Sequence, residues 1–275
     1  MLNKDNTKHL SALFLSSLFF GSTFIIVKIL LNVFSPVSIV FIRYFIASII
    51  FLILGGIPSK STWKPGLYLG IFLWVGYATQ TQGLTTTTTV NSGVVTGFYI
   101  VLTPFFSKFI NKTNLTKKNY YFSFLGFLGI VLVTLSSVDQ LFGNIFTLIC
   151  AFAYAIHIVL VERYVNFQKI SQLMFVQSFI GMMLCIPFIN FSETSLIIEN
   201  ILYLLFLGIL VNVAAFYLQL FGQKKVAAST SALILSLEGV FALFIGIIYA
   251  NEFLTLVNWF GIVLILVSIF FVIKE

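Results

Sequence analysis

The chain has 275 residues, of which 60% are hydrophobic and only 8% are charged, against about 25% charged residues in soluble globular domains. Its mean hydropathy of +1.09 and its 33 phenylalanines exclude a water-soluble protein with an ordinary polar surface. The formal net charge of +7 lies in short connecting segments, so it does not indicate binding to nucleic acid. Arginine is scarce beside lysine, a bias typical of AT-rich bacterial genomes. Composition therefore predicts an all-α, multi-pass membrane protein.

Apolar stretches separated by polar, glycine and proline residues recur along the chain. Each is close to the length of about 20 residues that a helix needs to cross a bilayer. The ten stretches are 10–31, 36–55, 66–84, 90–110, 120–137, 141–162, 171–190, 200–221, 228–250 and 256–273. The connections between them are too short to hold a soluble domain. We therefore expect ten transmembrane helices.

Basic residues predict the orientation, because cytoplasmic loops carry an excess of Lys and Arg. With the N-terminus in the cytoplasm, 13 of the 15 basic residues fall in cytoplasmic segments and none in the outer loops. The outer loops instead hold Asp139, Glu193, Glu199 and Glu252. The remaining two basic residues, Lys28 and Arg43, lie inside spans. The pattern predicts a cell-membrane protein with both termini in the cytoplasm.

The two halves of the chain resemble each other, and the matches occur in the same order. PVSIVFIRYFIAS at 36–48 aligns with ISQLMFVQSFIGM at 170–182. Weaker matches pair 96–106 with 231–241 and 129–133 with 261–265. Because each half holds an odd number of spans, the second copy must enter the membrane upside down. Such inverted repeats, here expected over 1–138 and 139–275, are typical of secondary transporters with a site near the midplane.

These stretches also give the chain a resemblance to EamA-type members of the drug/metabolite transporter superfamily. The matching segments are FFGSTFIIVK at 19–28, PVSIVFIRYFIAS at 36–48, GLTTTTTVNSGVVTGFYIVLTPFF at 83–106 and SALILSLEGVFALFIGIIYANEFLTLVNWFGIVLIL at 231–266. The resemblance implies a 5+5 inverted repeat, with spans one to four and six to nine around a central cavity. It also implies transport of amino acids, other metabolites or drugs by alternating access.

The chain departs from the family pattern in the ninth span. The residue after the ninth-span glutamate is often proline in the family, whereas Gly239 stands there in this chain. Pro104, in the corresponding place of the fourth span, is kept. We therefore take Pro104 and Gly239 as candidate hinges, with a helix break less forced at Gly239.

Glu238, in the middle of the ninth span, and Arg43, about two turns into the second, are the leading candidates for a substrate site. An ionisable group at the bilayer centre costs about 2.5–3.5 kcal/mol on insertion scales, so it usually faces a cavity or a partner. Glu238 either contacts substrate or a coupled proton, or it forms a buried ion pair. Arg43 either binds an anionic group of a substrate, pairs with Glu238 or contacts a lipid headgroup.

A histidine, four aromatic residues and a lysine inside the predicted spans also need an interpretation. His157 has no other ligand at metal-binding spacing, so it is either a hydrogen-bonded core residue or a proton relay, and we predict no metal and no cofactor. An aromatic set either lines a cavity for a flat or apolar solute or packs in the interior. It comprises Trp74, Tyr99, Tyr154 and Tyr217. Lys28 is close enough to the outer end of the first span for its side chain to reach the interface.

A run of five threonines, 85–89, lies between the third and fourth spans. Thr88 or Thr89 can cap the fourth helix, with Asn91 in its first turn. A Ser-Thr-Ser cluster that ends at Ser231 opens the ninth span at the opposite membrane face. Both clusters are either helix caps alone or also the rims of an outer and an inner gate.

The sequence holds no nucleotide-binding loop, zinc-protease motif or serine-hydrolase motif, so we expect neither an enzyme nor an ATP-driven pump. The leading hypothesis is secondary or facilitative transport of a small organic solute across the lipid bilayer, with a proton or another ion as a candidate coupling partner. Arg43 and the aromatic residues suggest an amphipathic, amino-acid-like solute with a carboxylate. A passive channel and a flippase for lipids or polyprenyl carriers are the alternatives.

Overall fold

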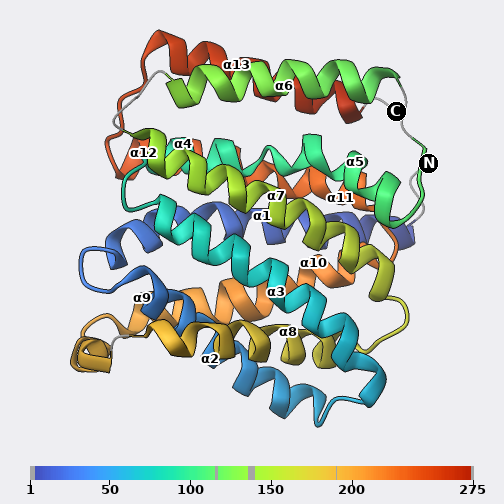
Figure 1. Cartoon of the computed structure of the whole chain (residues 1–275), viewed down its shortest axis with the longest axis vertical. Coiled ribbons are helices and arrows are strands. Elements are labelled where there is room, and N and C mark those ends of the chain that lie inside the picture. Colours follow the sequence, from blue (N-terminus) through green and yellow to red (C-terminus); the bar gives the residue numbers. More distant parts are fainter. Residues whose placement is uncertain (1–3, 115–116, 136–139, 190, 274–275) are drawn as a thin grey trace.

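The chain folds into a bundle of helices. The computed structural model describes residues 4–114, 117–135, 140–189 and 191–273. Within these ranges no residue belongs to a β-strand, which confirms the predicted all-α class. The helices lie side by side, and their connections gather at two opposite ends of the bundle (Figure 1).

The helices of the first half follow the apolar stretches of the sequence. They are α1 (Lys4–Leu30), α2 (Pro36–Gly55), α3 (Lys60–Gly83), α4 (Thr89–Thr96), α5 (Tyr99–Ile110) and α6 (Lys117–Leu135). Local sequence sets their ends. Ser35 caps α2, and Pro36 occupies the first turn, where a missing N–H costs nothing. Gly56 ends α2 at a φ of +65°, which favours glycine.

The second half is also helical and contains more irregular turns. Its elements are α7 (Leu141–Tyr164), α8 (Ile170–Cys185), the short turns η2 (Ile186–Phe188) and η3 (Phe191–Leu196), α9 (Ile201–Leu205), the π-helical segment η4 (Phe206–Ala215), α10 (Phe216–Gln223), α11 (Ala228–Leu235), α12 (Leu237–Tyr249) and α13 (Leu256–Ile273). α9, η4 and α10 follow one another without a gap. A π-helical segment inside a helix often marks a functional position.

Seven of the described helical stretches are long and apolar enough to cross a membrane, against the ten that the sequence predicted. They are Thr7–Leu30, Pro36–Gly55, Thr89–Ile110, Leu141–Tyr164, Ile170–Phe188, Ile201–Gln223 and Ala228–Tyr249. α3 is long but carries Lys60, Lys64 and a polar C-terminal turn. The apolar parts of α6 and α13 are shorter, at Phe124–Val133 and Leu256–Ser268.

Some predicted boundaries also need correction. α1 and α3 each begin six residues earlier than predicted, at Lys4 and Lys60. Polar residues end an apolar stretch but do not end a helix, which continues where its backbone can still form hydrogen bonds. The last two residues of the predicted fifth span, 136–137, and the predicted boundary between the repeats lie outside the described residues.

Two helix pairs form the opposite edges of the bundle. α6 packs along α13 at one edge, and α2 packs along α8 at the other (Figure 1). Glycines bring the first pair close together, because a Cβ on Gly129 or Gly261 would come within 2.8 Å of the carbonyl oxygen of the other. α1, α7 and the pairs α4–α5 and α11–α12 lie between the edges.

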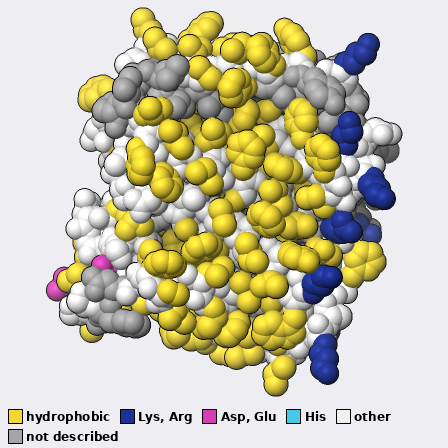
Figure 2. Space-filling view, in the orientation of Figure 1, with side chains coloured by type: hydrophobic (Ala, Val, Ile, Leu, Met, Phe, Trp, Pro, Cys, Tyr) yellow, Lys and Arg dark blue, Asp and Glu magenta, His cyan; other side chains and the backbone are white. Residues whose placement is uncertain are grey.

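Charged and apolar side chains are separated along the helix axes. On the face in Figure 2, Lys and Arg side chains line one end of the bundle, Asp and Glu lie at the other, and apolar side chains cover the surface between. α1 begins and α13 ends at the basic end (Figure 1). Large apolar side chains such as Ile53 and Leu202 are more than three-quarters exposed. This surface fits a lipid environment rather than water.

Candidate functional site

Two helices of the bundle are interrupted near their middle. α4 and α5 are separated at 97–98, and α11 and α12 are separated at Ser236. Both interruptions contain hydrogen bonds that close over three residues instead of four. The Phe98 N–H donates to the Val95 carbonyl at 3.1 Å, and the Gly239 N–H donates to the Ser236 carbonyl at 3.0 Å.

The interrupted helices cross each other at these points. α4 packs on α12, and α5 packs on α11. Small residues allow the close approach: a Cβ on Gly93 would lie 2.3 Å from the Ala242 Cβ, and a Cβ on Gly239 would lie 2.9 Å from the Gly93 carbonyl oxygen. Tyr99 begins α5 and Glu238 lies in the first turn of α12, so the crossing brings both residues to the centre of the bundle.

The interruptions are centred at 97–98 and Ser236, six residues before Pro104 and three before Gly239, the hinges predicted from the sequence. Pro104 lies inside α5, and Gly239 lies in the first turn of α12. Proline has no N–H to donate to the carbonyl four residues earlier, and the three-residue hydrogen bonds lie on the N-terminal side of that position. α11 and α12 contain no proline. There the Ser236 hydroxyl donates to the Leu233 carbonyl at 2.7 Å and competes with the helix ladder.

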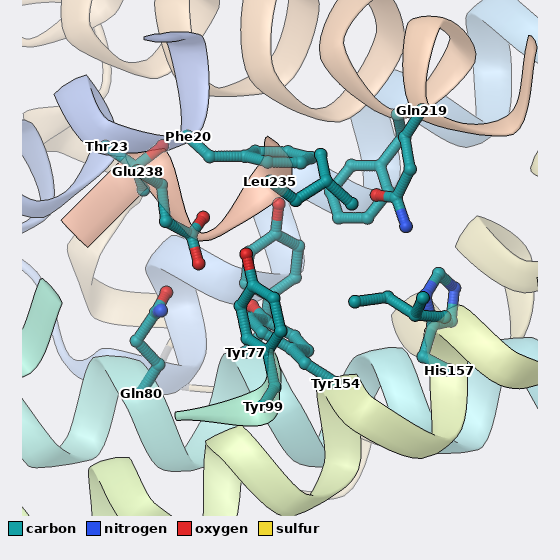
Figure 3. A pocket seen from close by; sticks show the side chains of 12 residues that line it. Phe20, Thr23, Tyr77, Gln80, Tyr99, Tyr154, His157, Gln219, Leu235 and Glu238 are labelled. Carbon is teal, nitrogen blue, oxygen red and sulfur yellow. The ribbon is translucent and has the colours of Figure 1, made fainter. Parts of the chain in front are cut away.

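A cavity lies beside the crossing (Figure 3). α1, α3, α5, α7, α10, α11 and α12 all contribute to its wall. The lining residues are Phe20, Thr23, Tyr77, Gln80, Tyr99, Tyr154, His157, Ile158, Phe216, Gln219, Leu235 and Glu238. Aromatic rings and neutral polar groups make up most of this wall, and Glu238 is its one carboxylic acid.

Glu238 is the most distinctive group of the cavity. Only 4% of the residue is exposed, and its Oε1 has no hydrogen-bond partner among the described residues. Its carboxyl group points toward the hydroxyl groups of the tyrosine cluster, which consists of Tyr77, Tyr99 and Tyr154 (Figure 3). A buried carboxyl oxygen without a partner costs free energy that a bound ligand can recover. The Glu238 side chain therefore presents an unpartnered acceptor at the cavity wall.

The opposite part of the cavity wall is polar but neutral. His157 Nε2 lies 3.2 Å from the Gln177 Oε1, so His157 is a hydrogen-bonded core residue that also lines the cavity. Gln219 donates to the Gln223 Oε1 at 3.1 Å, and Gln223 donates to the Ile158 carbonyl at 2.9 Å. These bonds join α7 to α10 beside the cavity.

Arg43 lies behind the cavity wall rather than in it. Its guanidinium carbon is 3.8 Å from the centroid of the Tyr77 ring, and its Nε donates to the Asn212 Oδ1 at 3.0 Å. The Tyr77 hydroxyl donates to the same oxygen at 2.9 Å. Arg43 is fully buried, so it does not contact a lipid headgroup. Its Nη1 and Nη2 have no hydrogen-bond partner among the described residues, so it does not pair with Glu238.

Two of the predicted aromatic residues, Tyr99 and Tyr154, line the cavity, and the other two do not. Trp74 lines a separate pocket. Its Nε1–H donates to the Cys185 Sγ, with 3.3 Å between the nitrogen and the sulfur. Tyr217 is 42% exposed on the outer surface. Helix rotation, which composition does not reveal, decides which aromatic side chains face inward.

Asn91 and Ser231 are buried, and their side chains form hydrogen bonds near the first turns of α4 and α11. The Asn91 Nδ2 donates to the Gln140 Oε1 at 2.9 Å. The Ser231 hydroxyl donates to the Val226 carbonyl at 3.2 Å. Neither residue lines the cavity.

The threonine run forms a capped junction at the acidic end of the bundle. Thr88 is the N-cap of α4, and its hydroxyl accepts from the Asn91 N–H at 3.1 Å, as the sequence predicted for Thr88 or Thr89. The Glu252 carboxylate accepts from the N–H groups of Thr89 and Val90, at 2.6 and 2.8 Å. A negative charge thus sits at the positive end of the α4 dipole.

A positive charge caps the carbonyl groups that follow α3, just as the negative charge of Glu252 caps the N–H groups of α4. The Lys28 ammonium donates to the carbonyls of Leu84 and Thr87, at 2.6 and 2.7 Å, instead of extending to the interface as expected. Thr87 also donates to the Asn144 Oδ1 at 2.5 Å. Side chains from α1, α7 and the loop after α12 therefore converge on the threonine run.

A similar junction closes the basic end. Glu162 accepts from the Ala228 N–H at the start of α11, at 3.0 Å, and from the Asn111 Nδ2 at 2.6 Å. Arg163 donates to the Ile110 carbonyl at the end of α5, at 2.7 Å. Charged side chains thus cap interrupted helices at both ends of the bundle.

Several neutral polar residues in or beside the cavity were missed by sequence reasoning. Tyr77 and Gln80 lie three residues apart on α3, and Gln219 and Gln223 lie four apart on α10. Polar residues three or four apart in an apolar helix share a face. This spacing is the signal that identifies them. Among the described residues, no group of three His, Cys, Asp or Glu side chains could hold a metal ion.

A partly polar central cavity, apolar outer faces and charged side chains that lie mainly at the two ends, apart from the buried Arg43 and Glu238, are the features of a multi-pass membrane protein. The sequence model of the EamA-like transporter family matches residues 7–135 and again 141–274. The chain belongs to this family and is a transporter of it.

Relatives agree with this assignment. An uncharacterized transporter of Archaeoglobus fulgidus (strain ATCC 49558 / DSM 4304 / JCM 9628 / NBRC 100126 / VC-16) is 36% identical over 262 residues, 94% of this chain and 83% of the relative. The uncharacterized transporter YyaM of Bacillus subtilis (strain 168) is 32% identical over 134 residues, 46% of this chain and 44% of the relative. A solved crystal structure with 14% identity superposes with a TM-score of 0.62 over 94% of this chain and 97% of its own, so it shares the fold.

Proposed function

We propose that this protein is a secondary or facilitative transporter that moves a small organic solute through the central cavity by alternating access. The observation that carries the proposal is the position of Glu238, which is buried at the crossing of two interrupted helices and has one carboxyl oxygen without a partner. Interrupted helices that meet at a midplane site are typical of secondary transporters.

The pattern of helix contacts supports a 5+5 repeat over 1–138 and 139–275. When a helix of the first half packs on a helix of the second half, the two helices at the equivalent positions of the opposite halves also pack on each other. α1 packs on α12 as α7 packs on α4 and α5, and α3 packs on α7 as α10 packs on α1. α2 with α8, and α6 with α13, are pairs of equivalent helices. The double match of the family model supports the same division.

Ten spans with both termini in the cytoplasm fit the distribution of charge. α3, α6 and α13 lie alongside the seven longer apolar helices rather than outside the bundle (Figure 1). Lys and Arg gather at one end of the bundle (Figure 2), and α1 begins and α13 ends at that same end (Figure 1). Positive residues favour the cytoplasmic side, so the threonine junction faces outward and the Glu162 junction faces inward. We assign these junctions as the outer and inner gates.

Counterflow in proteoliposomes tests the proposal. The purified protein is reconstituted, loaded with one unlabelled solute from a panel of amino acids, amines and amphipathic drugs, and assayed for saturable uptake of the labelled form. We expect exchange of at least one solute. Leu235→Trp, which fills the cavity, should reduce this exchange to the level of empty liposomes, while Phe244→Trp on the exposed face of α12 should keep the wild-type rate.

Leu235→Phe, a smaller insertion, separates blockage from misfolding, because it should give intermediate exchange in a protein with an unchanged gel-filtration profile. Undiminished exchange in folded Leu235→Trp would contradict transport through this cavity. Flux that rises linearly with solute concentration, accompanied by single-channel currents, would identify a passive channel instead.

A further inference from the structure

The wall of the central cavity carries charge of one sign only. Its 12 lining residues include no lysine or arginine, and Glu238 is the one carboxylic acid among them. The Glu238 Oε1 is buried and has no partner among the described residues. An ionised carboxylate in such a place is stabilised by a cation that forms a charge-assisted hydrogen bond with it.

Aromatic faces surround the same carboxyl group. Tyr77 and Tyr99 both pack against Tyr154, with ring centroids 6.2 and 6.5 Å apart. Phe20 and Phe216 add two more rings, with centroids 4.7 Å apart. Aromatic faces attract cations within about 6 Å of the ring centroid and also cover apolar groups.

An anionic group of a solute finds no cation in this wall. Arg43, the one guanidinium near the cavity, stacks on the far face of the Tyr77 ring and already donates to Asn212. Its charge acts on the cavity only across that ring, whereas the Glu238 carboxyl group lies in the wall itself (Figure 3). The cavity wall therefore does not fit a solute that bears a carboxylate, which Arg43 had suggested in the sequence.

We infer that the cavity selects an organic monocation with an apolar or aromatic body, whose charged nitrogen is held between the Glu238 carboxylate and the tyrosine faces; this step rests on the proposed transport function. The apolar body of the solute lies along Phe20 and Phe216. The neutral polar groups of Gln219 and His157 lie at the other part of the wall, where a solute can place a further hydrogen-bonding group.

Three probes of matched shape test the inference: 2-phenylethylammonium, 2-phenylethanol and 3-phenylpropanoate. Their affinities for the full chain in lipid nanodiscs are measured by equilibrium dialysis with labelled probes. We expect the cation to bind about tenfold more tightly than the alcohol, and the anion more weakly than both. Glu238→Gln should remove the preference for the cation and leave the affinity for the alcohol unchanged, which also shows that the variant is folded.

Glu199→Gln is the matched control, because it removes the same charge from an exposed position at the acidic end. It should leave all three affinities unchanged. Tighter binding of 3-phenylpropanoate, or equal binding of the cation by wild type and Glu238→Gln, would overturn the inference, as would the absence of any binding. If the anion exchanges in counterflow through wild type and not through Leu235→Trp, transport through the cavity stands and only the selectivity for cations falls.

Discussion

At the residue scale, the cavity depends on side chains that do not themselves face it. Asn212 is one of these, because its Oδ1 accepts hydrogen bonds from both the Arg43 Nε and the Tyr77 hydroxyl. The bond fixes the ring of Tyr77 between the guanidinium and the cavity. Asn212 lies on η4, where the π-helical geometry changes the direction in which a side chain points.

Asn212→Leu leaves two buried donors without an acceptor, so it should lower the free energy of unfolding by about 1–3 kcal/mol. Asn212→Asp keeps an oxygen that can accept both hydrogen bonds and adds a negative charge beside Arg43, so its stability should equal or exceed that of the wild type. Unfolding in mixed detergent micelles measures both. A leucine variant as stable as the wild type would show that the Asn212 bonds do not hold Arg43.

Sequence reasoning identified Glu238, Tyr99, Tyr154 and His157, all of which line the cavity. An ionisable or polar residue in an apolar helix must face the interior, so its identity alone predicts its side. Sequence reasoning did not determine the partner of Arg43, because several kinds of side chain can accept hydrogen bonds from a buried guanidinium. Only the rotation of α2 relative to α3 and η4 decides between them.

At the element scale, the crossing of the interrupted helices depends on glycine where two backbones meet. A Cβ on Gly93 would overlap Ala242, whereas a Cβ on Gly97 would meet its nearest neighbour at 3.4 Å. Gly97 also has a φ of −55°, which any residue adopts. The two glycines lie four residues apart, so they form a matched pair.

Gly93→Ala should lower the free energy of unfolding by about 1–3 kcal/mol, because the added methyl group pushes α4 away from α12. Gly97→Ala should change it by less than about 0.5 kcal/mol. Thermal unfolding in detergent, followed by intrinsic fluorescence, compares the two. Equal midpoints for the two variants would mean that α4 and α12 are not in contact at Gly93.

The elements themselves show which features a sequence can predict. The apolar stretches located the helices, because burial in lipid requires apolar length. They did not locate the interruptions at 97–98 and Ser236, which depend on hydrogen bonds within a turn. The Thr88 cap followed from local chemistry, whereas Glu252 and Lys28 reach the same junction from distant parts of the chain.

At the scale of the whole molecule, the two junctions lie at opposite ends and the cavity lies between them. Both join the ends of interrupted helices to charged side chains from other helices, Glu252 and Lys28 at one end and Glu162 and Arg163 at the other. We propose that the contacts of each junction form or break together, so that one junction opens while the other stays closed. Alternating access then follows if the cavity communicates with each side in turn.

Labelling of a single added cysteine from both sides tests this central claim most directly. Thr23 lines the cavity and is buried, so Thr23→Cys places a thiol of similar size at the site. Wild-type protein sets the baseline, because its two cysteines, Cys150 and Cys185, are both buried. Right-side-out and inside-out vesicles are each treated with a membrane-impermeant maleimide.

Alternating access predicts that Thr23→Cys is labelled above the wild-type baseline in vesicles of both orientations, and that Leu235→Trp in the same chain slows labelling from both sides. Labelling from one side alone, or from neither, would contradict a cavity that opens in turn to the two faces of the membrane.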